Sequence, residues 1–189
     1  MAFCVLNAIH AGAWLTLGPA LASETIGRVA WGWVLSAEAA GVLIATAVLL
    51  RVPLPRPLFV GMGGVALLGV PMLLLALAPS ALLLVLAAFV AGIGLEIFGM
   101  GWNLAMQEHI DESQLSRAYS YDALGSFVAI PVGQMAYGPL GDRFGLAPAI
   151  AVSGAAYVLS ALGVLLSRSV RSLPRASLAA PDPEPTAPR

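Results

Sequence analysis

Four ionisable side chains lie inside long apolar stretches of the sequence: His10, Glu38, Glu96 and Asp122. An ionisable group in such a stretch is costly unless it faces a cavity or a partner. A carboxyl group in apolar surroundings can take up a proton, and hydration lets it release that proton. An imidazole exchanges protons near neutral pH. The four residues are therefore candidates for coupling proton movement to another process.

Glu96 belongs to the clearest pattern, a stripe of small and polar residues. Its members are spaced four, three, four and four residues apart: Gly92, Glu96, Gly99, Asn103 and Gln107. This spacing places them on one face of a helix. Such a face suits a water-filled path or a substrate cavity, so Asn103 and Gln107 are candidate path residues. Hydrogen bonding between helices is the alternative, and we favour the cavity for Glu96.

A similar stripe lies near the N-terminus. Asn7, His10, Trp14 and Gly18 are spaced three, four and four residues apart, which again predicts one helix face. Asn7 and Trp14 are therefore further candidates for lining a substrate path. A lone histidine more often packs or hydrogen-bonds than carries protons, so His10 ranks below the glutamate of the longer stripe.

The other two carboxyl groups have alternatives of equal weight. Glu38 shares a helix face with Leu35 and Gly41, and pairing with a polar group on a neighbouring helix explains it as well as proton coupling does. Asp122 lies near one end of its apolar stretch. Orienting the loop around Arg117 explains this aspartate at least as well as transport does.

The composition of the 189-residue chain decides which elements hold these groups. The chain is 59% hydrophobic and 10% charged, and its mean hydropathy is +0.89. An ordinary soluble domain is roughly 45–50% apolar and about 25% charged. Too few polar residues are present to cover a globular surface, which excludes a soluble enzyme, a nucleic-acid binder and a disordered chain. The lipid bilayer is therefore the expected partner.

Six stretches are long and apolar enough to cross a bilayer as helices, which takes about 20 residues each. They are residues 2–21, 29–50, 57–78, 81–106, 119–139 and 146–166. Helices are expected and not barrel strands, because the apolar runs are continuous. The ionisable residues fall in the first, second, fourth and fifth spans, which should surround something polar. The third and sixth should face lipid or pack outside.

Further predictions concern the start of this all-α membrane domain and two of its prolines. The first span ends in Ala20-Leu21-Ala22, as a cleaved signal peptide does, but it has no positive region before it. A membrane span is therefore preferred over a signal peptide. Pro71 and Pro131 lie inside spans, where each removes a backbone hydrogen bond and should kink its helix.

The arginines predict the orientation of the spans. One side holds Arg51, Arg56, Arg117, Arg168, Arg171 and Arg175, whereas the other holds only Arg28 and Arg143. The positive-inside rule then places both termini of this multi-pass protein in the cytoplasm, with the bundle in the inner or plasma membrane. Residues 1–167 are expected to form the bundle. The proline-rich residues 168–189 are expected to be a disordered cytoplasmic tail.

Several short motifs carry a family resemblance. They are Leu17-Gly18-Pro19, Ala30-Trp31-Gly32, Arg56-Pro57-Leu58, the segment from Gln107 to Asp122, and Gly138-Pro139-Leu140. With these motifs the chain resembles the C-terminal six-helix half of a major facilitator superfamily transporter. The likeness is greatest to the bacterial drug-efflux branch that contains macrolide-efflux and siderophore-export proteins.

The resemblance implies efflux of a hydrophobic small molecule by proton antiport, with two six-helix bundles rocking about a midplane site. One bundle supplies half of such a cavity. The expected partner is therefore a missing N-terminal half, which we favour, or a second copy. A non-transporting membrane interaction protein, or an inert remnant, is the alternative. No motif for a catalytic nucleophile, a metal or a phosphate loop is present, so no enzyme activity, metal or cofactor is expected.

Overall fold

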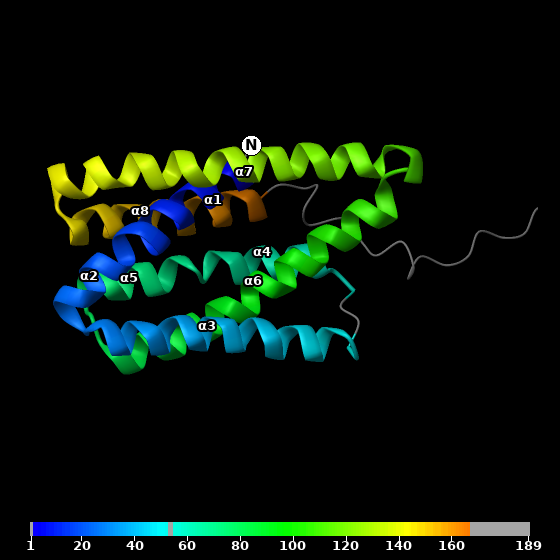
Figure 1. Cartoon of the computed structure of the whole chain (residues 1–189). Helices are drawn as coiled ribbons and strands as arrows, with labels where there is room; N and C mark the ends of the chain where they lie inside the picture. Colours follow the sequence, from blue (N-terminus) through cyan, green and yellow to red (C-terminus); the bar gives the residue numbers. More distant parts are fainter. Residues whose placement is uncertain (1, 53–54, 167–189) are drawn as a thin grey trace, which may run out of the picture.

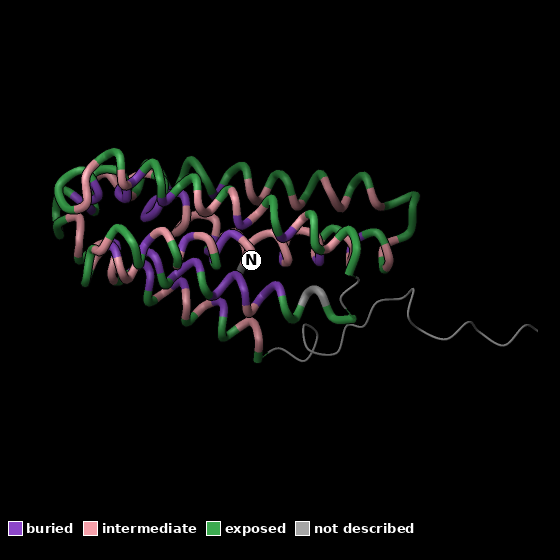
Figure 2. The backbone as a smooth tube through the Cα atoms, turned by 90° about the horizontal axis from the view of Figure 1, so that it is seen from below, coloured by how far each residue is buried: buried purple, intermediate pink, exposed green. Residues whose placement is uncertain are grey.

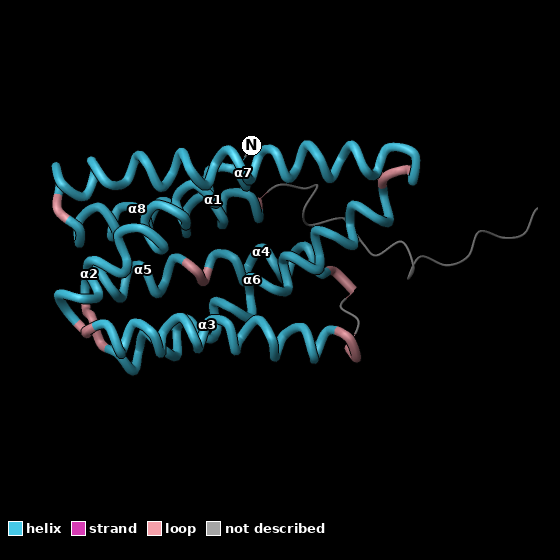
Figure 3. The backbone as a smooth tube through the Cα atoms, viewed as in Figure 1, coloured by secondary structure: helices cyan, strands magenta, loops and turns pink. Residues whose placement is uncertain are grey.

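The computed structural model describes residues 2–52 and 55–166, and helices account for 90% of them. Those ranges contain no strand, so the predicted all-helical class is confirmed. The elements are α1 (Ala2–Ile9), η1 (His10–Leu17), α2 (Gly18–Thr25), α3 (Arg28–Leu49), α4 (Pro57–Ala66), α5 (Gly69–Leu77), α6 (Ala81–His109), α7 (Glu112–Phe144) and α8 (Leu146–Leu165) (Figures 1 and 3). The predicted tail, residues 168–189, lies outside the described residues.

Five helical stretches are long and apolar enough to cross a membrane. They are Phe3–Thr25, Arg28–Leu49, Phe59–Leu77, Ala81–His109 and Leu146–Leu165. These stretches agree with the first, second, third, fourth and sixth predicted spans. The fifth predicted span, residues 119–139, lies inside the 33-residue helix α7. That helix is long enough to cross a bilayer, but more polar residues interrupt its apolar sequence, so a sixth crossing stays a prediction.

The first stretch is one continuous rod in which the hydrogen-bond pattern changes. Between α1 and α2, residues His10–Leu17 form the π-helix η1. Pro19, in the first turn of α2, has no backbone N–H and cannot continue an α-helical hydrogen bond to the preceding turn. The Thr16 hydroxyl donates to the Ala11 carbonyl, 2.9 Å away and five residues earlier. π-Helical turns are rare and often lie at functional sites.

The two prolines inside predicted spans have different effects. The third span is interrupted at Leu67 and Leu68, between α4 and α5. Pro71 therefore falls in the first turn of α5, where a helix does not need the missing N–H. Pro131, in contrast, lies inside α7, which continues past it.

The third span is half-buried in the bundle, which its lack of ionisable residues did not indicate, and lipid contact of its exposed half stays a prediction. Half of its 18-residue apolar window (50%) is buried, against 17% for α3. Glycines allow this burial, because Gly61 lies against the backbone of Phe98 and Gly64 lies against Gly94. A span without ionisable residues can therefore form the apolar core of the bundle as well as its lipid surface.

Four helix pairs hold the bundle together. α6 packs along both α3 and α4, α5 packs along α8, and α1 with η1 packs along α7 (Figure 1). The largest buried side chains come from several of these helices and include Trp14, Leu68, Met72, Leu84 and Ile150. Figure 2 shows the buried residues on the inward sides of the helices and the exposed residues on their outward sides. α3 and α7 are therefore the helices with the most uncovered surface.

Candidate functional site

The contact between α3 and α6 positions the two carboxyl groups, Glu38 and Glu96. A methyl group added to Gly92 would collide with the backbone carbonyl of Glu38, and one added to Gly41 would collide with the carbonyl of Phe89. The two helices therefore approach closely only because glycine stands at both positions. Glu96 follows this contact by one turn of α6, so the two carboxyl groups lie on neighbouring helices.

Glu38 is held by an indole and not by a cation. The Trp14 Nε1–H donates to Oε2 of Glu38 over 2.9 Å. Trp14 itself is buried, with 1% of its surface exposed, and its ring meets Trp31 edge to face at a centroid distance of 4.7 Å. The Glu38 carboxyl group therefore joins η1 and α3.

Glu96 is held by a hydroxyl group that has a second partner. Oγ1 of Thr46 on α3 lies 2.8 Å from Oε1 of Glu96 and 3.0 Å from the carbonyl oxygen of Val42. A threonine hydroxyl carries one hydrogen and two lone pairs. It can donate to a charged Glu96, or it can accept from a protonated Glu96 while donating to the Val42 carbonyl. The bond between Thr46 and Oε1 of Glu96 is therefore available in both protonation states of Glu96.

His10 has no such partner. Its Nε2 atom is buried and makes no hydrogen bond within residues 2–52 and 55–166. The same is true of Nε1 of Trp102 on α6, which lies in a ring cluster with Phe3 and Phe98. Buried polar groups are normally paired. These two nitrogens are therefore positions where a polar partner would be stabilising.

Asn7 and Asp122 lie on two helices that pack together. The Asn7 side-chain amide on α1 donates to the Ser126 hydroxyl on α7 over 3.1 Å. Asp122 is half-buried one turn earlier on α7. Its side chain makes no hydrogen bond or ion pair with the described part of the chain, and in particular none with Arg117. The structure thus gives no support to the loop-orienting role, and it assigns Asp122 no other contact.

The stripe on α6 divides into a packed end and an open end. Gly92 is covered by α3, whereas an added methyl group at Gly99 would meet nothing within 4 Å. Asn103 and Gln107 are exposed. The Asn103 amide donates to the Gly99 carbonyl over 2.9 Å, and the Gln107 amide donates to the Tyr119 hydroxyl over 3.3 Å. Glu96 lies where the packed end meets the open end.

The stripe predicted in the first span does not share one face. Asn7 contacts α7, whereas Trp14 contacts α3. A spacing of three and four residues keeps side chains on one face of an α-helix, and the π-helical turns of η1 change that register. Thr46 was not predicted as a partner of Glu96. Its position eight residues after Glu38, about 80° from it around α3, is the signal that could have indicated it.

The comparisons and the structure together define a broad class of protein. No family model, no curated protein and no solved structure matches the chain. Among the described residues, no group of three or more His, Cys, Asp or Glu side chains could hold a metal ion. The chain is an all-helical protein with several long apolar helices, which is compatible with a membrane protein.

Replacing Trp14 by phenylalanine tests the bond to Glu38. Trp14→Phe keeps an aromatic ring but removes the only donor to this carboxyl group among the described residues. Glu38 is half-buried, so the loss of its donor should cost about 1 kcal/mol of unfolding free energy, the lower end of the range for a buried acceptor. The measurement is unfolding of the detergent-solubilised chain by sodium dodecyl sulfate, followed by helix content.

Two further variants separate the hydrogen bond from the loss of ring volume. Trp33 is 66% exposed, so Trp33→Phe should change the unfolding free energy by less than about 0.5 kcal/mol. In a Glu38→Met background, Trp14→Phe should lose part of its effect, because the acceptor is already absent. Equal effects of Trp14→Phe in the two backgrounds would show that the bond contributes nothing.

Proposed function

We propose that the chain is a six-helix membrane bundle that forms one half of a transporter, which exports a hydrophobic small molecule in exchange for protons. Five apolar helices of spanning length support the membrane location, and α7 supplies the sixth crossing. The sequence motifs that resemble the C-terminal half of a major facilitator superfamily transporter support the drug-efflux branch as its family. The arginine distribution supports a cytoplasmic location of both termini and the cell membrane as the location of the bundle.

One observation carries the proposal: Glu96 lies in an apolar helix beside a hydroxyl group that serves both of its protonation states. A charged side chain at the centre of a membrane helix costs roughly 2.5–3.5 kcal/mol on insertion scales, so it is retained where it has a function. Thr46 can donate to the charged form and accept from the neutral form. Glu96 can therefore exchange a proton while it keeps its bond to Thr46.

The exposed surfaces of α7 and α3 support the proposal that a second helix bundle is the partner. Only three of the 33 residues of α7 are buried, namely Ala129, Gly133 and Gly141. α3 is also poorly covered, as its buried share of 17% indicates. Lipid covers part of this surface, and a second six-helix bundle covers the rest. That partner is a separate N-terminal half or a second copy, and the open end of the α6 stripe faces the shared cavity.

Flux through reconstituted vesicles tests the function. The chain is placed in vesicles as a proven monomer and as an associated pair of bundles, with a pH gradient across the membrane. Ethidium and a radiolabelled macrolide serve as hydrophobic probes. We expect gradient-driven movement of a probe only in the paired preparation, because one bundle supplies half of the cavity.

Two results would count against the proposal. Robust flux from the monomer would contradict the requirement for two bundles. Equal probe leakage with and without the pH gradient, in the paired preparation, would contradict proton-driven export.

A second function has specific support. The bonds from Asn7 to Ser126 and from Gln107 to Tyr119 each join two helices, which is what polar residues do when they only hold a bundle together. The chain would then be a non-transporting membrane interaction protein. In that case a partner protein would associate with the bundle. Neither the chain nor its Glu96 variants would move a probe across the membrane.

A further inference from the structure

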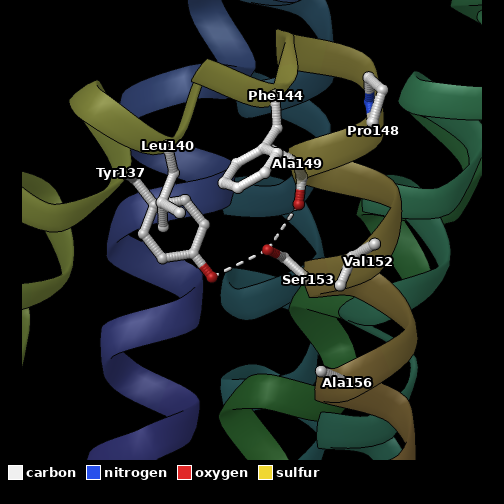
Figure 4. A pocket seen from close by; sticks show the side chains of 8 residues that line it. All are labelled: Tyr137, Leu140, Phe144, Pro148, Ala149, Val152, Ser153 and Ala156. Atoms are coloured by element: carbon white, nitrogen blue, oxygen red, sulfur yellow. Dashed lines mark hydrogen bonds between the residues drawn. The ribbon is translucent and has the colours of Figure 1, made fainter. Parts of the chain in front are cut away.

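A groove between α7 and α8 lies away from the carboxyl groups of the proposed transport site. It encloses about 500 Å³ and is lined from α7 by Tyr137, Leu140 and Phe144, and from α8 by residues between Pro148 and Ala156 (Figure 4). This volume lies within the usual range of ligand sites, roughly 300–1,000 Å³. Pro148 and Ala156 are eight positions apart, which is about 12 Å along the helix axis. The groove is therefore elongated and runs inward from the connection between the two helices.

The polar side chains in the wall of the groove already form hydrogen bonds within the protein. Its polar side chains are Tyr137 and Ser153, whose hydroxyl oxygens lie 2.8 Å apart. Ser153 in turn donates to the Ala149 carbonyl over 2.7 Å, which leaves the tyrosine hydroxyl to donate to Ser153 (Figure 4). Both hydroxyl hydrogens are thus used inside the protein. The remaining wall is apolar, and Val152, which lines the groove, is 70% exposed. An apolar chain suits this wall.

A cation lies over one aromatic ring of the groove wall. The guanidinium carbon of Arg143 lies 5.5 Å from the centroid of the Phe144 ring, and that ring lines the groove. Arg143 is exposed and has no ion pair with the described residues. Asp142 is also exposed, but consecutive side chains on a helix point about 100° apart. Arg143, and not the aspartate, is the charge held over a ring of the groove wall.

We propose that this groove binds an anionic phospholipid, with one acyl chain along α8 and the headgroup phosphate at Arg143. The two parts of the site match the two parts of such a lipid: an apolar channel with satisfied hydroxyl groups, and an arginine suited to phosphate. The proposal rests on the membrane location proposed above. It does not depend on transport, because the groove contains none of the residues of the proposed proton path.

Lipid binding to the detergent-solubilised full chain tests the proposal by native mass spectrometry. The probes are dioleoyl phosphatidylglycerol and dioleoyl phosphatidylcholine, which share their acyl chains and differ in net charge. The first bound phosphatidylglycerol should reach half-saturation at about fivefold lower concentration, since one arginine near an anionic headgroup contributes about that factor. Arg143→Gln should remove this preference, so that the two lipids bind at similar concentrations. Val152→Trp should weaken binding of both lipids by filling the groove.

Matched variants control for charge and bulk. Arg28 is an exposed arginine at the start of α3, so Arg28→Gln should keep the fivefold preference. Val29 on α3 is 78% exposed and lies outside the groove, so Val29→Trp should bind both lipids as the parent does. The proposal is wrong if Arg143→Gln keeps the preference or if Val152→Trp binds both lipids normally. Competition by millimolar inorganic phosphate with no effect of Val152→Trp would indicate a free-anion site and would also overturn it.

Discussion

Gly92→Ala should destabilise the bundle by about 1–3 kcal/mol or more, although alanine is the better helix former. The added methyl group would collide with the backbone carbonyl of Glu38 on α3. A backbone atom inside a helix cannot move aside as the end of a flexible side chain can, so α3 and α6 would have to separate. Overpacking of this kind typically costs 1–3 kcal/mol. The free energy of unfolding in mixed detergent and dodecyl sulfate micelles measures the effect.

The matched control lies on the same helix. Gly99→Ala adds the same methyl group where nothing lies within 4 Å. It should be neutral or stabilise the chain by up to about 1 kcal/mol, which is the difference in helix propensity. Gly41→Ala, at the other side of the α3–α6 contact, should resemble Gly92→Ala. Equal stability of Gly92→Ala and Gly99→Ala would show that the two helices do not depend on this close approach.

Helix positions could be predicted from the sequence because hydropathy over 20 residues is a strong signal. Five of the six predicted spans coincide with apolar helices, and the continuous runs excluded alternating strands. The burial of a span could not be predicted in this way. α4 and α5 carry no ionisable residue, which fits both a lipid-facing helix and a core helix. Contacts such as Gly64 against Gly94 decide between them, and these depend on the neighbouring helix.

In the candidate site too, the spacing predicted which residues share a helix face, but it did not predict which neighbouring helix covers that face. Spacing placed Gly92, Glu96 and Gly99 on one side of α6, but it could not show that α3 covers the first of these and leaves the last uncovered. Asn7 and Trp14 were assigned to one stripe by α-helical spacing. The π-helix between them turns them toward different neighbours. Periodicity assumes regular helices, and it says nothing of a change in the hydrogen-bond pattern.

Glu96→Gln, in the complete two-bundle assembly, should preserve folding and abolish uphill, proton-driven efflux. A glutamine side-chain oxygen can still accept from the Thr46 hydroxyl, so the contact between α3 and α6 survives. A glutamine cannot release a proton, so the pH gradient can no longer drive export. Downhill exchange of the probe should continue, because it requires the cavity and not the proton. The measurement compares uphill and downhill probe flux in reconstituted vesicles, with helix content as the check on folding.

Thr46→Val tests the contribution of the Thr46 hydroxyl group to efflux separately from that of the Glu96 carboxyl group. Valine matches threonine in shape but leaves Glu96 without the hydroxyl that serves both protonation states. If proton exchange at Glu96 drives efflux, Thr46→Val should slow the uphill flux and change its dependence on pH, while downhill exchange continues. A residue that only packs would change stability and leave the pH dependence alone. If Glu96→Gln pumps as well as the parent, Glu96 is such a packing residue. Glu38, held by the Trp14 indole, is then the next carboxyl group to replace.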